Sequence, residues 1–336
     1  MPGATYDLLR GLLVTKHALE YIVLAIAFVF IILFSIFIDG FATLGNLSNM
    51  ARNSAALVVL SCGMAVVIIA RGLDLSQIAV MVAVSSVFGL LLSNGSGYGT
   101  ALGAAFVLAI ALGIFNGWLI AFIEIPALLS TLATAMLIAG FGRWGILRGE
   151  YLVLLPKDLP VMMFLSTGNV LLLPVSVILA ALVLVATAVL LDRTILGQAI
   201  HAMGDNYMAA RLTGFSVRIA IIWTYIFSAL TATVAGLIIS SASGTVDFRI
   251  VTNGTLLFEV IMVVVLGGVP LRGGRGGVIN VIIGVLLISV LRNGMTLMNL
   301  SSQVQDLVKG LVLISAIVID NYFNPRDTET DTQGDL

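Results

Sequence analysis

The segment DRTILGQAIHAMGDNYMAARLTGFSVR, residues Asp192–Arg218, separates two long apolar runs, Val170–Leu191 before it and Ile219–Ile239 after it. Only 10% of the residues in the chain are charged, yet this segment contains Asp192, Arg193, His201, Asp205, Arg211 and Arg218. A link between two spanning helices needs only a few residues. A polar segment this long indicates either an ordered surface that docks a partner or an amphipathic loop lying on the bilayer surface.

A short helix is predicted inside this segment. Asp205 or Asn206 can cap its N-terminus by accepting hydrogen bonds from free backbone N–H groups. Residues 207–212 (YMAARL) supply one to two turns, and Arg211 suits the negative end of the helix dipole. Gly214 then fits a left-handed stop.

The composition indicates an integral membrane protein. Hydrophobic residues make up 60% of the 336, and the mean hydropathy is +1.15, which leaves too little polar surface for a soluble domain. The net charge of −1 gives no electrostatic reason to expect nucleic acid as a partner. Cys62, the one cysteine, lies in an apolar run and is expected to pack as a small hydrophobe. No cleavage site follows the first apolar run, which is therefore expected to be a retained span rather than a signal peptide.

Apolar runs approaching the length of a spanning helix, about 20 residues, recur along the chain. Ten candidates are Tyr21–Ile38, Ala55–Ala70, Ile78–Leu92, Ala101–Ile123, Pro126–Leu147, Val170–Leu191, Ile219–Ile239, Leu256–Val269, Val278–Leu291 and Leu307–Ile319. The predicted fold is all-α, a polytopic membrane protein of about ten transmembrane helices. Several runs are short; they are either broken helices of the kind found in transporters or spans that gain length from flanking Thr, Ser and Gly.

Charge predicts the orientation and the ends of the membrane domain. With the N-terminus inside, nine Lys and Arg residues fall on the cytoplasmic side and seven on the outer side. The most basic short loops, around Arg193–Arg218 and Arg272–Arg275, both fall inside, as the positive-inside rule requires. Residues 1–20 are predicted to be a cytoplasmic segment, residues 21–320 the membrane domain and residues 321–336 a polar tail.

A degenerate internal repeat is predicted from two Asn-Gly pairs. Asn116-Gly117 closes the fourth candidate span and Asn293-Gly294 closes the ninth, 177 residues later. Spans two to five would then match spans seven to ten, an offset of five helices. Because five is odd, the two units would have opposite topology, as in the inverted repeats of transporters.

Polar groups inside the hydrocarbon are costly, so each is a candidate for function. Asp74 lies in GLDLS, residues 72–76, where Gly72 is expected to break the helix and Asp74 can cap a helix beginning near Gln77. Glu259 stands inside an otherwise apolar span. For both acids, a structural role as a cap or a buried hydrogen-bonding group is the alternative to contact with a solute.

Nothing in the sequence indicates catalysis. The two histidines, His17 and His201, lie at predicted membrane borders, and no Cys/His set has metal-ligand spacing. The glycine-rich run at residues 266–277 lacks the Gly-Lys-Ser/Thr ending of a nucleotide site and is better explained by a tight turn and close helix packing. The chain is therefore not expected to be an enzyme or to hold a cofactor.

Several short motifs follow one another in a fixed order. They are residues 72–76 (GLDLS); Asn116-Gly117, Ile125-Pro126 and Thr131-Leu132; residues 196–197 (LG), 202–206 (AMGDN) and 209–214 (AARLTG); residues 265–268 (VLGG) and 273–276 (GGRG); Asn293-Gly294; and residues 308–310 (VKG). Taken in this order, they resemble the membrane permease subunits of ribose-type sugar ABC importers. The similarity covers roughly residues 50 to 320.

The resemblance implies a multi-pass subunit of the bacterial inner membrane that translocates a small neutral solute, a sugar or sugar alcohol, delivered by a periplasmic binding protein. ATP and Mg would bind to a separate ATPase subunit, and a second permease subunit, identical or paralogous, would complete the pathway. The ATPase would dock on the cytoplasmic loop 192–218, at Gly204, Asp205, Asn206, Ala209, Ala210, Arg211 and Gly214. The predicted translocation path comprises Asp74, Ser76, Asn116, Pro126, Thr131, Glu259 and Asn293.

The chain departs from the family pattern at three places along the presumed path. Gln77-Ile78 stand where the family usually has Val-Gly, Ala127 where a second proline is typical, and Ile261 where an acidic residue is usual. These differences concern the identity of the solute rather than the class of protein. An ion-gradient-driven secondary transporter that uses Asp74 or Glu259 is the alternative function, and it would work as a single polypeptide.

Overall fold

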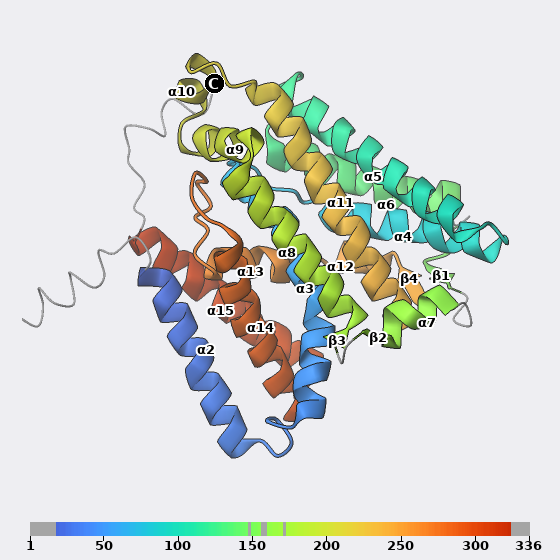
Figure 1. Cartoon of the computed structure of the whole chain (residues 1–336), viewed down its shortest axis with the longest axis vertical. Helices are drawn as coiled ribbons and strands as arrows, with labels where there is room; N and C mark the ends of the chain where they lie inside the picture. Colours follow the sequence, from blue (N-terminus) through green and yellow to red (C-terminus); the bar gives the residue numbers. More distant parts are fainter. Residues whose placement is uncertain (1–17, 147–148, 156–159, 171–172, 324–336) are drawn as a thin grey trace, which may run out of the picture.

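The described part of the chain is built almost entirely from helices (Figure 1). The computed structural model describes residues 18–146, 149–155, 160–170 and 173–323. Most of the predicted N-terminal segment 1–20 and of the polar tail 321–336 therefore lies outside the described residues. The helices are α2 (Ala18–Phe37), α3 (Leu44–Ile69), α4 (Gln77–Ser93), α5 (Tyr98–Ala121), α6 (Ala127–Phe141), α7 (Pro160–Thr167), α8 (Val175–Arg193), α9 (Ile195–Asp205), α10 (Tyr207–Leu212), α11 (Val217–Ser243), α12 (Arg249–Asn253), α13 (Thr255–Leu266), α14 (Val278–Leu297) and α15 (Ser302–Phe323).

Short extended pieces and one π-helical turn complete the described structure. The turn η1 (Gly142–Ile146) follows α6. Strand β1 (Leu152–Leu154) pairs antiparallel with β4 (Thr245–Asp247), and β2 (Asn169–Val170) pairs antiparallel with β3 (Leu173–Pro174). Figure 1 shows α9 and α10 near one end of α11, with the β1–β4 pair and α7 near the other end of that helix.

Each of the ten predicted apolar runs coincides with a helix. Among the described residues, α2, α3, α5, α6 with η1, α8, α11 and α14 are seven helices long and apolar enough to cross a membrane. Helices α4 and α13 are shorter, with 17 and 12 residues. The all-α, polytopic membrane class is therefore confirmed, whereas the number of ten spans stays a prediction.

Two helix boundaries differ from the apolar runs for local reasons. Helix α3 begins at Leu44, eleven residues before the apolar run, because Thr43 caps it by accepting from the Asn46 N–H at 3.3 Å. Helix α8 begins at Val175 rather than at residue 170, because the β2–β3 pair occupies the preceding residues and Pro174 is the N-cap.

The segment Asp192–Arg218 contains two helices, although only one was predicted. Thr194 caps α9 by accepting from the Gly197 N–H at 3.0 Å. Helix α10 has the predicted bounds, and Asn206 caps it by accepting from the Ala209 N–H at 2.9 Å. Asp205, the other predicted cap, is instead the last residue of α9.

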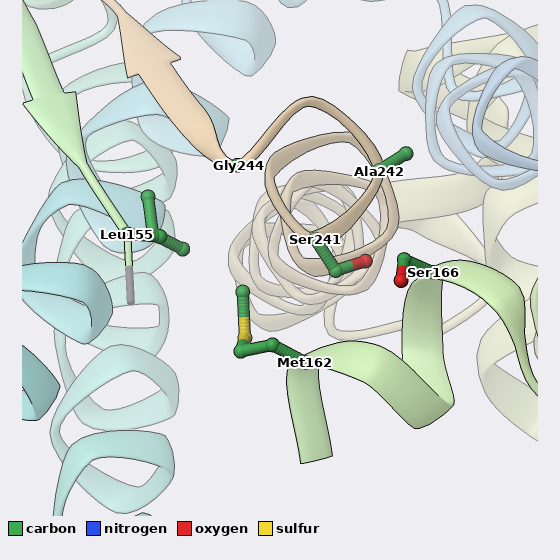
Figure 2. A pocket seen from close by; sticks show the side chains of 6 residues that line it. All are labelled: Leu155, Met162, Ser166, Ser241, Ala242 and Gly244. Atoms are coloured by element: carbon green, nitrogen blue, oxygen red, sulfur yellow. The ribbon is translucent and has the colours of Figure 1, made fainter. Parts of the chain in front are cut away.

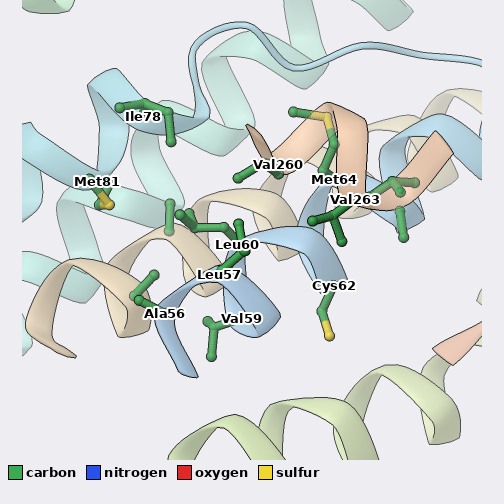
Figure 3. Close-up of a cluster of buried hydrophobic side chains, with 14 of the residues drawn as sticks. Ala56, Leu57, Val59, Leu60, Cys62, Met64, Ile78, Met81, Val260 and Val263 are labelled. Carbon is green, nitrogen blue, oxygen red and sulfur yellow. The ribbon is translucent and has the colours of Figure 1, made fainter. Parts of the chain in front are cut away.

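Helices α3 and α11 form the centre of the bundle. Helix α11 packs against α3, α4 and α5, while α3 also packs against α8, α13 and α14. Figure 3 shows α3 residues such as Leu60 and Met64 among Ile78 of α4 and Val260 and Val263 of α13. Large apolar side chains are exposed on the outer faces of α2, α5, α6 and α8, as expected for helices that face lipid.

Contacts of the helices α3–α6 correspond to contacts of the helices α11 and α13–α15. Helix α4 packs on α5 and α6, and α13 packs on α14 and α15. Likewise, α11 packs on α5 and α4, and α3 packs on α14 and α13. These are the equivalent contacts that an inverted repeat with an offset of five spans would produce. The repeat itself remains a prediction.

Glycines allow α5 and α11 to approach closely. A Cβ at Gly113 would lie 2.7 Å from Ile226 Cα, and a Cβ at Gly117 would lie 2.6 Å from Ile222 Cα. This spacing of four residues places both glycines on the face of α5 that contacts α11. Gly103, on the same helix, has open space around it.

We expect Gly113→Ala to lower the free energy of unfolding by about 1–3 kcal/mol, because the added methyl group overlaps the α11 backbone. Gly103→Ala should leave it unchanged or raise it by up to about 1 kcal/mol, because alanine favours helix. Thermal unfolding of the purified protein in detergent measures both. Equal melting temperatures for the two variants would contradict this packing.

Candidate translocation path and docking surface

A buried polar cluster forms where the chain breaks between α3 and α4. Asp74 is 2% exposed. Its Oδ1 accepts from the Ser76 N–H at 3.0 Å and from Ser76 Oγ at 2.6 Å, and its Oδ2 accepts from Ser228 Oγ of α11 at 2.7 Å. Asn116 Nδ2 of α5 donates to Ser76 Oγ at 2.7 Å. The carboxyl group therefore joins the break to two membrane helices.

Thr131 of α6 attaches the same break to a third helix. Its Oγ1 accepts from the Leu75 N–H at 3.1 Å and lies 3.1 Å from the Leu73 carbonyl oxygen. Buried backbone groups that leave a helix need such partners. The four predicted path residues Asp74, Ser76, Asn116 and Thr131 thus lie together around one break.

The break between α3 and α4 includes Gly72, but the predicted cap is wrong in one detail. The residue with a left-handed backbone after α3 is Arg71, with φ +64°. Gly72 leaves room for a neighbour, because a Cβ there would lie 2.8 Å from Tyr225 Oη. Asp74 does not cap α4 directly: the N-cap residue is Ser76, and the Asp74 carboxylate accepts from the N–H of Ser76, one residue before the helix.

The remaining predicted path residues lie in other contacts. Glu259 of α13 is buried, with Oε1 3.5 Å from Arg292 Nη1 and Oε2 3.7 Å from Lys309 Nζ. Asn293 exchanges two hydrogen bonds with Asn46 of α3, at 2.8 and 3.0 Å. Pro126 is exposed at the N-terminus of α6. The structure therefore does not bring these three residues to the Asp74 cluster through hydrogen bonds.

The side chains that contact Asp74 and Glu259 were not identified from the sequence. Ser228 is one serine among many in apolar helices, and nothing local distinguishes it. Arg292 and Lys309 lie 33 and 50 residues after Glu259 in the sequence, so no local pattern pairs them with it. Gln77, one of the departures from the family pattern, is fully buried and donates its Nε2 to the Leu60 carbonyl oxygen at 2.9 Å, so it joins α4 to α3.

Gly204 lies at a junction of three segments. A Cβ at Gly204 would overlap the Ile69 carbonyl oxygen at the end of α3. The Gly274 N–H, from the glycine-rich run, donates to that same oxygen at 2.9 Å. His201 Nδ1 of α9 lies 3.3 Å from the Gly274 carbonyl oxygen. Gly204 is therefore a packing residue in this structure, buried beneath the surface of the loop.

The predicted docking residues separate into buried and exposed groups. Gly204 and Ala210 are buried, whereas Asp205, Asn206, Ala209, Arg211 and Gly214 are exposed. Gly214 has the left-handed conformation predicted for it, with φ +89°. Helix α10 also exposes two large apolar side chains, Met208 at 59% and Leu212 at 86%. Clustered exposed apolar groups are typical of a surface that binds a partner.

A small cavity lies at the far end of α11 from α10. It measures about 110 Å³ and is lined by Ser241 and Ala242 of α11 and by Met162 and Ser166 of α7. Figure 2 shows the Ser241 side chain pointing toward Ser166. Leu155, just after β1, closes another side. The α7 segment therefore packs against this end of α11 without filling all the space.

We expect Asp74→Ala to lower the free energy of unfolding by about 2–4 kcal/mol, because the buried donors at Ser76 and Ser228 lose their acceptor. Ser228→Ala should lower the free energy of unfolding by less, because both hydrogen bonds from Ser76 to Asp74 remain. Glu124→Ala breaks only an exposed ion pair with Arg218, and we expect it to cost at most about 1 kcal/mol. Thermal unfolding in detergent compares the three, and similar losses for Asp74→Ala and Glu124→Ala would contradict the role of this cluster.

Comparison with known proteins gives consistent matches over most of the chain. Residues 46–317 match the protein family described as branched-chain amino acid transport system / permease component. The ribose import permease protein RbsC of Escherichia coli (strain K12) is 30% identical over 286 residues, which cover 84% of this chain and 87% of RbsC. The galactofuranose transporter permease protein YtfT of the same strain is 29% identical over 279 residues, 82% of this chain and 80% of YtfT.

A third relative is the autoinducer 2 import system permease protein LsrC of Yersinia enterocolitica serotype O:8 / biotype 1B. It is 30% identical over 285 residues, which cover 84% of this chain and 76% of LsrC. No solved structure matches the chain.

The matched range takes in the Asp74 break, the Gly204 junction and the Glu259 contacts. The resemblance to permeases of ribose-type importers is confirmed by these relatives. The chain belongs to the branched-chain amino acid transport system / permease component family and is a multi-pass permease of the bacterial inner membrane.

Proposed function

We propose that this chain is the permease subunit of an ABC importer for a small neutral solute, a sugar or sugar alcohol. A periplasmic binding protein delivers the solute, and a separate ATPase subunit binds ATP and Mg and supplies the energy of ATP hydrolysis. A second permease subunit, identical or paralogous, completes the path. The names of the three relatives refer to ribose, galactofuranose and autoinducer 2, whereas the family description refers to branched-chain amino acids.

The chemistry of the Asp74 cluster supports a neutral solute. Apart from Asp74 itself, its side chains are hydroxyl and amide groups, from Ser76, Asn116, Thr131 and Ser228. A zwitterionic amino acid would need charged partners for its ammonium and carboxylate groups when it leaves water. Sugar hydroxyls need only neutral donors and acceptors, and Asn116 Oδ1 in this cluster is a buried acceptor without a partner among the described residues.

The observation that carries the proposal is the exposed surface of α10. Met208 and Leu212 offer an apolar centre, and Asp205, Asn206 and Arg211 offer polar groups around it. Apolar anchors within a polar rim are typical of protein interfaces. We therefore assign α10 as the element that docks on the ATPase.

Helix α10 is connected to the Asp74 cluster through α9 and the end of α3. Helix α10 follows α9, whose Gly204 sits against the Ile69 carbonyl oxygen at the end of α3. Residues 70–76 continue from there to the Asp74 cluster. When the ATPase pair closes on ATP, rigid-body movement of α9 and α10 would shift this break and change access to the path.

The contacts of the two buried acids favour this function over ion-driven transport. Asp74 already receives three hydrogen bonds from Ser76 and Ser228. Glu259 faces Arg292 and Lys309. A coupling carboxyl group must exchange its ion during each cycle, whereas both of these acids are held by partners within the chain.

We expect Leu212→Asp and Arg211→Glu to reduce co-purification of the ATPase subunit at least about tenfold, because interface anchors contribute 1–2 kcal/mol or more and 1.4 kcal/mol is tenfold in affinity. Arg193→Glu is the matched control, because Arg193 is exposed on the same side but lies outside α10. Pull-down from membranes that contain the complete importer measures the effect. Normal recovery with both α10 variants would rule out docking at this surface.

A further inference from the structure

A second cavity, of about 250 Å³, lies between α4, α11, β4 and α12. Its lining includes Met81, Ser85, Ser240, Ser243, Asp247 and Ile250. The α11 residues belong to its C-terminal end, whereas α10 precedes its N-terminus. Helix α11 has 27 residues, which at 1.5 Å per residue span about 40 Å. The cavity and α10 therefore lie toward opposite faces of the membrane.

Ser85 is the residue that indicates a ligand. It is 3% exposed, lines the cavity, and its Oγ has no hydrogen-bond partner among the described residues. Its neighbour Ser86 is equally buried but donates to the Val82 carbonyl oxygen at 2.7 Å. A buried hydroxyl without a partner costs about 1–3 kcal/mol, so a polar group inside the cavity would offset that cost.

The absence of a side chain at Gly236 of α11 makes room for the Ser85 hydroxyl group, because a Cβ at Gly236 would overlap Ser85 Oγ. Ser240 lies one turn further along the same helix and also lines the cavity. Met81 and Ile250 contribute apolar surface, so hydroxyl groups and apolar groups face the same volume.

Asp247 and Arg249 form an ion pair beside the cavity. Arg249 Nε lies 3.0 Å from each Asp247 carboxylate oxygen, and its Nη2 lies 2.8 Å from Oδ2. Hydrogen bonds from Arg249 hold the pKa of Asp247 below its usual value, so the carboxyl group is ionised at neutral pH. Because the two charges offset each other, the pair offers hydrogen-bonding groups without favouring a charged ligand.

We propose that this cavity is a binding site for a neutral, hydroxylated solute of monosaccharide size, with Ser85 and Ser240 contacting its hydroxyl groups. The volume lies just below the range of about 300–1,000 Å³ typical of sites for drug-sized ligands. Met81 and Ile250 would contact the C–H face of a sugar. The proposal rests on the proposed import of a sugar, and it places the entry site on the face opposite α10.

Introduced thiols test the site directly. The native Cys62 is buried, so a single new cysteine gives the signal. In the complete permease in nanodiscs, we expect Ser85→Cys to react with a small methanethiosulfonate reagent at least about tenfold faster than Ser86→Cys, because thiol reactivity follows access. D-ribose should slow the reaction of Ser85→Cys severalfold, and L-leucine should not.

Equal reaction rates for Ser85→Cys and Ser86→Cys would contradict the proposed binding site. So would the absence of protection by D-ribose when the complete wild-type importer takes up D-ribose; in that case the proposed function would stand without this inference. Uptake of L-leucine instead of D-ribose by the wild-type importer would contradict the proposed function itself. The two failures are therefore distinguishable.

A second variant keeps the proposal testable if thiols perturb the cavity. Ser85→Ala removes a hydroxyl group that has no hydrogen-bond partner among the described residues, so the melting temperature should stay the same or rise. The KM for D-ribose uptake should nevertheless increase about fivefold, the loss of roughly one hydrogen bond to the solute. An unchanged KM would contradict binding by Ser85.

Discussion

The structure depends on one shared backbone oxygen. The Ile69 carbonyl oxygen accepts from the Gly274 N–H at 2.9 Å, and Gly204 packs against it so closely that a side chain would overlap it. Three segments that are far apart in sequence meet there: the end of α3, the end of α9 and the glycine-rich run after α13. Because backbone atoms are packed directly on backbone atoms, we expect these segments to move together.

This junction links the two regions that we propose to be functional, the Asp74 cluster and the exposed surface of α10. Asp74 lies five residues after Ile69 and accepts a hydrogen bond from Ser228 of α11. It also accepts from Ser76, which in turn accepts from Asn116 of α5. On the other side of the junction, α9 leads into α10 and its exposed apolar side chains. In the proposed function, such a mechanical path would convert movement of the ATPase subunit into a change of access to the translocation path.

Local features of the fold could be predicted from sequence, and long-range contacts could not. The apolar runs located the spanning helices, and the caps at 206 and 214 located α10, because hydropathy and capping act within a few residues. Gly204 was expected on the docking surface, but it is buried against Ile69, a neighbour 135 residues away that no local pattern specifies. The partner of Asp74 on α11 and the cations facing Glu259 depend in the same way on how distant helices pack.

The central claim is that the α9–α10 element and the membrane-buried break move as one unit. Hydrogen–deuterium exchange of the permease, with and without its ATPase subunit, tests it most directly. We expect slower amide exchange on ATPase binding both at residues 206–214, where the partner would contact the chain, and at residues 69–77, which it would not touch. Protection confined to residues 206–214 would contradict mechanical coupling through the Ile69 junction.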